Sequence, residues 1–293
     1  ATVMLEWCLP VQTDIDPLLK QSDLIVLCLG LSPNLEGEEM PVEIPGFSGG
    51  DRTSLDLPAP QEALLKKAAA SGKPVVLVLM NGSALSINSA DRRVPAIVEA
   101  WYPGEEGGRA VADVLFGDYN PAGRLPVTFY KSTDQLPPFE NYDMKGRTYR
   151  YFTGEVLYPF GHGLSYTTFE YSGLSLPTEI VSGDSVKVSV TVKNTGSIAG
   201  EEVVQVYVTD LEASVPVPVR ALAGFRRVAL APGESAVCEF SLSPEVFMII
   251  NENGVRVAEP GVFEITAGGK QPGFKGTADA STTTVVSGQV TLR

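Results

Sequence analysis

Three glutamates within four positions, Glu36, Glu38 and Glu39, are the side chains of this sequence best suited to acid–base chemistry. Carboxylates that lie close together raise one another's pKa, and a general acid that works near neutral pH needs a raised pKa. The cluster belongs to a long segment, residues 30–52, in which no regular periodicity is visible. On composition alone, a solvated acidic loop is the simpler interpretation of such a cluster.

Histidine and cysteine offer little further chemistry. The one histidine, His162, argues against a Ser–His–Asp triad or a multi-histidine metal site, and a lone histidine between two glycines is more often structural than catalytic. The cysteines, Cys8, Cys28 and Cys238, are odd in number and widely spaced, which fits neither a disulfide framework nor a zinc site. We expect them to be small buried thiols.

Composition and charge narrow the classes of partner. The 293 residues include 22 Lys+Arg and 35 Asp+Glu, a formal net charge of −13, and 44% of them are hydrophobic. Such a composition predicts a packed globular core, and so acidic a surface argues against nucleic acid as a partner. No apolar run approaches the ~20 residues that span a bilayer, so no membrane span is expected. The sequence begins at Ala1 rather than at a methionine, and we expect it to be part of a longer protein.

Up to residue 129, short apolar runs alternate with helical patterns. The predicted elements are strands at 24–29, at 75–79 and from 97, and helices at 60–72 and 107–116. Near-continuous apolar strands that alternate with helices predict an α/β three-layer sandwich with a mostly parallel sheet. The glutamate segment then follows the carboxyl end of a parallel strand, where open α/β sheets place ligands.

Beyond residue 166 the periodicity changes to that of half-buried strands. Valines alternate with polar residues at 186–193 and 204–208, and weaker alternation follows at 237–242 and 262–266. Short strands separated by turn clusters predict an all-β sandwich of fibronectin III or immunoglobulin type. We therefore predict an α/β domain at 1–129, an ordered connector at 130–165 and the β-sandwich at 166–293.

Three segments carry a resemblance to a known family. They read WYPGEEGGRAVADVLFGDYNPAGRLPVTF (101–129), RTYRYFTGEVLYPFGHGLSYTTFEYS (147–172), and VSVTVKNTGSIAGEEVVQVYV (188–208) continued by RALAGFRRVALAPGES (220–235). The first resembles the second domain of family 3 glycoside hydrolases, the second is similar to the junction that follows it, and the third resembles the family's fibronectin III-like domain. The resemblance identifies the chain as the C-terminal part of a β-glucosidase or β-xylosidase.

The resemblance also implies roles for particular residues. Family members are retaining enzymes, which use two carboxylates about 5–5.5 Å apart. The nucleophile would be an aspartate on an N-terminal (β/α)8 barrel, so no residue of this chain takes that role. The sequence Glu36-Gly-Glu38 is similar to the Glu-x-Glu of the acid/base loop, which implies Glu38 as general acid/base with Glu36 as the runner-up. Asp51 and Arg52 are expected to hold the loop through an ion pair rather than to contact sugar.

The implied partners follow from these roles. The substrate would be a β-linked oligosaccharide or glycoside that loses its terminal non-reducing glucose or xylose. The barrel would belong to the same protein or to a companion chain, and no metal or organic cofactor is expected. A homo-oligomer is left open, as is a periplasmic or secreted location, which would follow if a signal peptide precedes the chain.

Two other classes of protein fit parts of the sequence. A non-catalytic carbohydrate-binding module could use the β-sandwich and the aromatic-rich connector to hold saccharides. A structural or adhesion protein could be built on the fibronectin-like fold, although that interpretation leaves the glutamate segment and the α/β domain unexplained.

Overall fold

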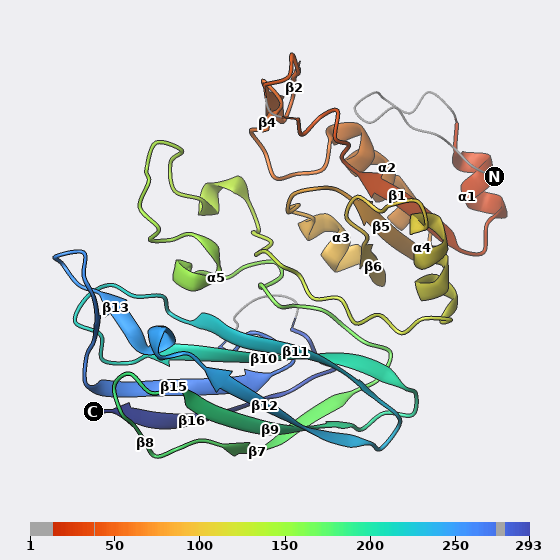
Figure 1. The fold of residues 1–293 in the computed structure, drawn as a ribbon. Coiled ribbons are helices and arrows are strands. Elements are labelled where there is room, and N and C mark those ends of the chain that lie inside the picture. Colours follow the sequence, from red (N-terminus) through yellow and green to blue (C-terminus); the bar gives the residue numbers. More distant parts are fainter. Residues whose placement is uncertain (1–13, 38, 274–278) are drawn as a thin grey trace. The chain divides into compact units, whose positions relative to one another are not determined.

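The computed structural model describes residues 14–37, 39–273 and 279–293 (Figure 1). The chain divides into two compact units. The first comprises Ala1–Phe116 with Phe129–Gln135, and the second comprises Gly117–Thr128 with Leu136–Arg293. Residues 130–135 fall in the first unit and residues 136–165 in the second.

A small parallel sheet forms the centre of the first unit. Its strands are β1 (Ile25–Gly30), β5 (Val75–Met80) and β6 (Ala96–Glu99), in the order β1-β5-β6. Both pairings are parallel, with Leu77 opposite Leu27 on one side and Ile97 on the other. These strands and their direction agree with the sequence pattern. The central strand β5 is the most buried, which explains its continuous apolar run.

The described part of the first unit also contains four α-helices: α1 (Asp16–Gln21), α2 (Ala59–Ala69), α3 (Asn88–Arg93) and α4 (Gly107–Phe116). The pattern predicted α4 with its observed bounds and α2 to within a few residues. A proline in its first turn starts α2, and Gly72, with a φ of +77°, follows its end. No pattern predicted α3, because its sequence NSADRR has no apolar period.

One cysteine of the first unit departs from expectation. Cys28 is exposed, whereas Cys238 in the second unit is buried and Cys8 lies outside the described residues. The reason is the position of β1 at the end of the sheet. Alternate side chains of a strand point to opposite faces, so Val26 and Cys28 share the outward face, and both are exposed.

The second unit contains two main sheets. One has the order β11-β10-β15-β16-β8 and the other β12-β9-β7. Their bounds are β7 (Phe169–Ser175), β8 (Glu179–Ile180), β9 (Val186–Asn194), β10 (Gly200–Asp210), β11 (Ala221–Leu230), β12 (Ser235–Leu242), β15 (Gly261–Gly268) and β16 (Val285–Leu292). All pairings are antiparallel except that of β16 with the short β8.

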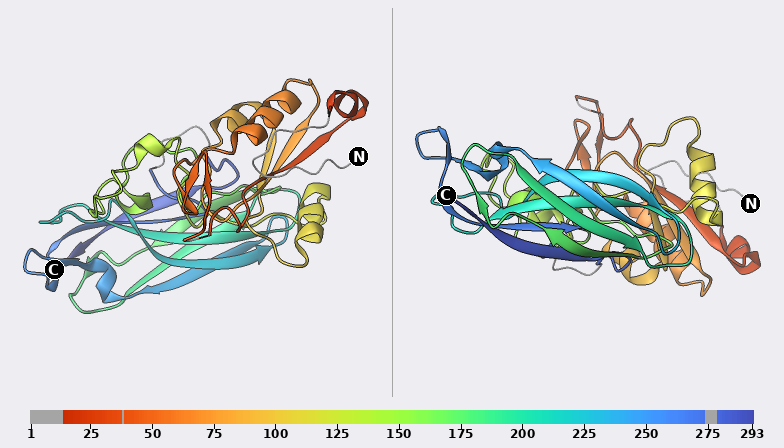
Figure 2. Two further views of the ribbon diagram at one scale, coloured as in Figure 1. Left: turned by 90° about the horizontal axis from the view of Figure 1, so that it is seen from above. Right: turned by 60° about the horizontal axis from the view of Figure 1, so that its bottom comes forward.

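Side chains from both sheets form one hydrophobic core. Figure 2 shows the backbone of the two sheets in two further views. The alternating valines of β9 and β10 point into it, as their period of two predicted; they are Val186, Val188, Val190, Val192, Val204, Val206 and Val208. Phe263 packs edge-on against Phe247 at a centroid distance of 5.3 Å. Phe247 belongs to the 3-10 turn η2 (Pro244–Phe247), which is followed by the hairpin β13 (Met248–Ile250) and β14 (Arg256–Ala258).

A buried ion pair ties the segment 117–128 to the β-sheet of the second unit. Arg124 Nη2 donates to Glu202 Oε2 at 2.6 Å, and Glu202 is completely buried. The hydroxyls of Tyr171 and Thr283 donate to its other oxygen at 3.0 and 2.8 Å. Removing one member of such a pair typically costs about 3–5 kcal/mol, because the other charge is left buried and unpaired.

The middle of the chain, 136–165, has little regular structure beyond α5 (Thr148–Tyr151). Its aromatic side chains are packed from Tyr149 onward, whereas Phe139 and Tyr142 are almost fully exposed. Tyr149 stacks on Phe160 at 4.1 Å, and the ring of His162 stacks on Tyr158 at 5.1 Å. The backbone of Arg150 accepts a hydrogen bond from Val219 N at 2.7 Å. The ring contacts hold the segment together, and the hydrogen bond from Val219 joins it to the chain just before β11.

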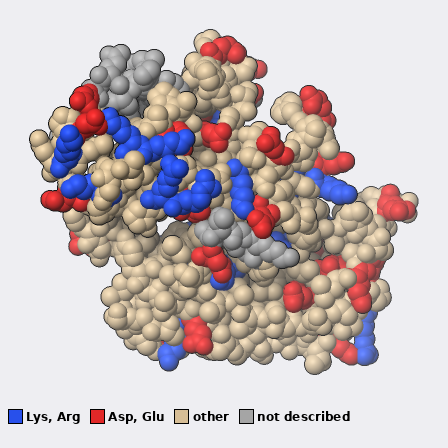
Figure 3. Space-filling model, turned by 180° about the vertical axis from the view of Figure 1, so that it is seen from behind, with Lys and Arg blue, Asp and Glu red and all other residues tan. Residues whose placement is uncertain are grey.

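Charge is unevenly distributed over the surface. On the face shown in Figure 3, lysine and arginine side chains gather over the first unit, despite the chain's net charge of −13. Two of its ion pairs, Lys67 with Asp16 at 2.7 Å and Lys66 with Glu62 at 3.3 Å, involve exposed side chains. Such pairs contribute little to stability. Within the described ranges, no helix is both long and apolar enough to cross a bilayer.

Candidate functional site

The glutamate segment leaves the first unit's sheet at the carboxyl end of β1, as the sequence predicted. Gly30 ends the strand with a φ of +139°, and a Cβ there would lie 2.0 Å from Met80 O. The side-chain amide of Gln61 donates to Gly30 O and accepts from Gly30 N, both at 2.8 Å. Leu31 N then donates to Met80 O at 2.7 Å, so the loop starts beside the end of β5.

A small antiparallel sheet, which the sequence did not reveal, organises the far part of the loop. Its strands are β2 (Glu43–Ile44), β3 (Phe47–Ser48) and β4 (Asp51–Arg52). Met40 N donates to Gly49 O at 3.0 Å. A Cβ on Gly50, whose φ is +88°, would lie 1.7 Å from Gly37 O. This sheet therefore folds back against Gly37 and Met40, and only glycine permits the approach at position 50.

Arg52 holds the loop, but through carbonyls and a hydroxyl rather than through Asp51. Its guanidinium donates to Ser54 O at 2.8 and 3.1 Å, to Ala84 O at 2.7 Å and to Ser83 Oγ at 2.8 Å. Within the described ranges it forms no ion pair with Asp51, so that expectation was wrong. Neighbouring residues of a strand point to opposite faces, and Asp51 is exposed on the other side of β4.

Glu36 is bound on both of its carboxylate oxygens. Oε2 accepts hydrogen bonds from Gly82 N at 3.0 Å and from the hydroxyl of Tyr102, and Oε1 accepts one from Ser83 Oγ. Burial and the adjacent Glu36 carboxylate both raise the pKa of Tyr102, so its hydroxyl stays protonated and donates. Burial lowers the pKa of Arg52, and the Glu36 charge opposes that change.

The three donors to Glu36, which are Gly82, Ser83 and Tyr102, form a clamp around its carboxylate. This clamp joins the carboxyl ends of all three parallel strands. The loop with Glu36 follows β1, Gly82 and Ser83 follow β5, and Tyr102 follows β6. Ligands in open α/β folds bind at this edge, because loops from neighbouring strands meet there. Figure 1 shows these loops leaving the same end of the sheet.

Glu99, at the end of β6, is a titratable group of this edge that sequence reasoning missed. Its Oε1 accepts from Trp101 N at 3.0 Å and its Oε2 accepts from Asn81 Nδ2 at 3.3 Å. Burial raises its pKa to about 7, although both hydrogen bonds oppose the change. Trp101 has a φ of +54° and packs edge-on against Phe129 at 6.1 Å. Glu99 thus supports the strained backbone before Tyr102.

Folding stability should fall as the pH rises from about 4.5 to about 7, because folded Glu99 keeps a proton that the unfolded chain releases. The full shift corresponds to about 3 kcal/mol, an upper value for a partly buried group. A Glu99→Gln variant should lose this decline while keeping the acceptor for Trp101 N. Urea unfolding at pH 5 and pH 8 measures it, with Glu105→Gln, an exposed carboxylate, as control. Parallel stabilities of Glu99→Gln and wild type across this range would contradict the assignment.

The structure brings some of the predicted site residues together and places others apart. Glu36 and Arg52 meet through Ser83 in the clamp, whereas Asp51 points away from it. Glu38 lies outside the described residues. Glu39 is described, with an exposed side chain and a φ of +53°. Among the residues that the structure describes, no three His, Cys, Asp or Glu side chains lie close enough to hold a metal ion.

Comparisons with known proteins agree with the architecture. Residues 13–166 match the glycosyl hydrolase family 3 C-terminal domain, and residues 202–271 match a fibronectin type III-like domain. Over 252 residues the chain is 48% identical to a xylan 1,4-β-xylosidase of Xylanibacter ruminicola, covering 85% of this chain and 29% of that protein. It is 40% identical to a periplasmic β-glucosidase of Salmonella typhimurium, again over 85% of this chain and 33% of the relative.

Solved structures show the same relation. A mutant β-glucosidase from Listeria innocua in complex with laminaribiose superposes with a TM-score of 0.82 and 33% identity, over 99% of this chain and 40% of the other. The chain thus spans about a third of the length of the curated relatives it matches. With its C-terminal-domain match covering more than half of the residues and its fibronectin III-like match following in order, the chain belongs to glycoside hydrolase family 3.

Proposed function

We propose that this chain is the C-terminal part of a retaining, exo-acting β-glycosidase that removes terminal glucose or xylose from β-linked substrates. The relatives are named as β-xylosidases and β-glucosidases, which supports the reaction class. The first unit would take the α/β three-layer arrangement and the second the fibronectin III sandwich, with an ordered connector between them. An N-terminal (β/α)8 barrel would supply the nucleophile and most of the sugar pocket.

Within this chain we assign the general acid/base to Glu38. The observation that carries the assignment is the clamp on Glu36, whose two oxygens accept three hydrogen bonds from Gly82, Ser83 and Tyr102. A general acid needs an oxygen whose proton can reach the glycosidic oxygen, and those of Glu36 are occupied. Glu36 would then be a positioning residue that anchors the loop, which leaves the second glutamate of the Glu-x-Glu sequence for chemistry.

The mechanism assigns two steps to the acid/base. It donates a proton to the glycosidic oxygen while the nucleophile of the barrel attacks the sugar, and it later takes a proton from the water that releases the sugar. Arg52 acts through Ser83, which it holds against the Glu36 carboxylate. The loop's attachments to Met80, Gly82, Ser83 and Tyr102 keep it at the carboxyl edge of the sheet.

The stereochemistry of hydrolysis tests this proposal. The full-length protein should release β-xylose or β-glucose first from an aryl β-xyloside or β-glucoside, because two successive inversions retain configuration. Proton NMR of the anomeric signals during the first minutes of turnover shows which anomer appears. An α-anomer as first product would exclude the retaining mechanism. Binding of these sugars without any hydrolysis would favour the other candidate, a carbohydrate-binding module.

A further inference from the structure

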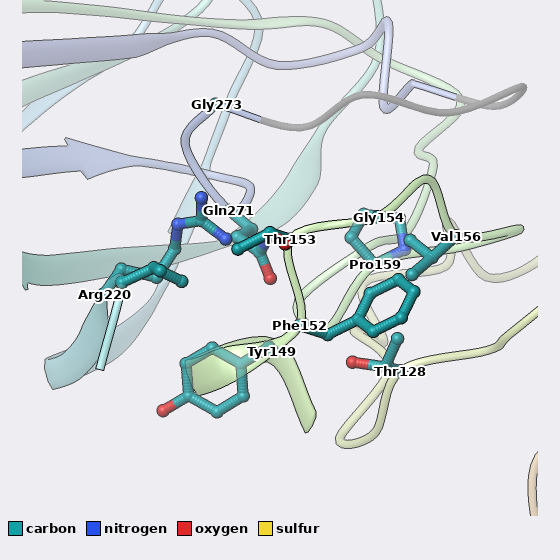
Figure 4. Close-up of a pocket in the computed structure, with 11 residues that line it drawn as sticks. Thr128, Tyr149, Phe152, Thr153, Gly154, Val156, Pro159, Arg220, Gln271 and Gly273 are labelled. Atoms are coloured by element: carbon teal, nitrogen blue, oxygen red, sulfur yellow. The ribbon is translucent and has the colours of Figure 1, made fainter. Parts of the chain in front are cut away.

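A cavity of about 170 Å³ lies within the second unit (Figure 4). One part of its wall comes from α5 and the residues after it, including Tyr149, Phe152 and Val156. The rest comes from Arg220 just before β11, from Gln271 after β15 and from Thr128. No role in the proposed reaction uses it.

The cavity wall is held in shape by its own contacts. Tyr149 accepts a hydrogen bond on its hydroxyl from Leu222 N at 3.2 Å and stacks on Phe160 at 4.1 Å. Val219 N donates to Arg150 O at 2.7 Å, so the chain before β11 is fastened to α5. A wall fixed in this way needs little ordering when a small molecule binds, which favours binding.

Two buried side-chain oxygens of the wall have no hydrogen-bond partner. The Oε1 of Gln271 and the Oγ1 of Thr128 both lack one, and these residues are only 7% and 8% exposed. A buried polar group without a partner costs about 1–3 kcal/mol, so few survive in folded proteins without a reason. The amide oxygen of Gln271 requires a donor, and the Thr128 hydroxyl can donate or accept.

Arg220 adds a charged donor to the same cavity. It is half-buried, burial lowers its pKa, and none of the described carboxylates pairs with it. In the view of Figure 4, Arg220, Gln271 and Thr153 lie together, while the Phe152 ring, Val156 and Thr128 lie on the other side. Polar groups therefore face an aromatic and aliphatic surface across the cavity, with the Thr128 hydroxyl as the polar group on that side.

We propose that this cavity binds a single pyranose sugar, separately from the glycosidase site. The ligand must offer hydroxyl donors to Gln271, hydroxyl or ring oxygens to Arg220, and C–H groups to Phe152 and Val156. A simple anion would satisfy Arg220 but has no donor for the Gln271 oxygen. Pockets for drug-sized ligands begin at about 300 Å³, and this smaller volume suits one sugar ring rather than an oligosaccharide.

The site would make this part of the protein a sensor or anchor for free monosaccharide or for a sugar branch. A ligand of about a dozen heavy atoms binding through a few polar contacts predicts a Kd of about 1–10 mM. This inference does not depend on Glu38 or on the retaining mechanism, because no residue of the cavity belongs to the glutamate loop. The sugar site can therefore be disproved without affecting the proposed glycosidase function, and the reverse also holds.

Hydrogen exchange of the full-length protein with added D-xylose or D-glucose tests the site locally. At a sugar concentration of about ten times the Kd, amides of 149–156 and 219–222 should exchange about tenfold more slowly. The reason is that a bound ligand lowers the population of the locally open state by a factor of about one plus the ratio of ligand concentration to Kd. Amides of the first unit report any sugar bound elsewhere. Sodium sulfate at the same concentration is the control for an anion site.

Two nearly isosteric variants, Thr128→Val and Gln271→Leu, should each remove most of the protection. Without sugar their Tm should be unchanged or higher, because each removes a buried side-chain oxygen that has no partner. Gln289→Leu, the same change at an exposed position on β16, should keep the protection. Protection by sulfate but not by sugar, protection that survives both cavity variants, or no protection by either sugar would each overturn the proposal.

Discussion

Replacing Glu38 by glutamine in the full-length protein is expected to slow hydrolysis of substrates with poor leaving groups by roughly 10²–10⁴-fold. Glutamine keeps the size of the side chain but can neither give nor take the proton. Aryl glycosides with good leaving groups depart without protonation, so their first step should suffer far less. Azide should then restore turnover, because an anionic nucleophile needs no general base in the second step.

The neighbouring glutamates provide matched controls for this experiment. Glu39→Gln changes an exposed side chain and should leave turnover close to that of the wild type. Glu36→Gln should lower activity without azide rescue, because it weakens the hydrogen bonds from Gly82, Ser83 and Tyr102. Normal turnover in Glu38→Gln, together with azide rescue of Glu36→Gln or Glu39→Gln, would transfer the acid/base role to the rescued position.

The second large effect is expected from the 293-residue chain alone, which should show no measurable hydrolysis of aryl β-glucosides or β-xylosides. A covalent glycosyl-enzyme requires a nucleophile, and we assign that group to the barrel outside this chain. The relatives are about three times as long, which is consistent with a missing partner domain. A chromogenic assay at high protein concentration measures the difference between the chain and the full-length protein.

Circular dichroism should accompany this assay, so that an unfolded preparation is not counted as an inactive one. Adding the separately produced N-terminal part provides a further control, since restored activity would show that the two parts divide the site. Turnover by the folded chain alone, at a rate comparable with the full-length protein, would refute the division of roles.

Strands and helices were predictable where their apolar residues recur with the period of that secondary structure. The continuous apolar run of β5 reflects burial on both faces of its sheet, and the alternating valines of β9 and β10 reflect burial on one face. Both patterns can be recognised in a single sequence. The glutamate loop was located correctly because β1 ends at Gly30 and its pairing with β5 is parallel.

Contacts between distant residues were not predictable. Strands of two residues, such as β2 and β3, have no period to detect. The hydrogen bonds of Gln61 with Gly30 and of Glu36 with Ser83 join residues 31 and 47 positions apart. Glu99 looks like an ordinary strand residue until Asn81 and Trp101 surround it. Glu38 and the domain boundaries at 129 and 166 stay predictions.

The division of the chain into units has a consequence for inheritance. The chain passes between the units after Phe116, after Thr128 and after Gln135. The stretch 129–135 holds Ser86 and Asn88 through the carbonyls of Tyr130 and Lys131, and 117–128 is held by the pair of Arg124 with Glu202. A recombination event with a single crossover between the units would separate one unit from the segment that belongs to it, either 129–135 or 117–128. The two units are therefore expected to pass together from one gene to another.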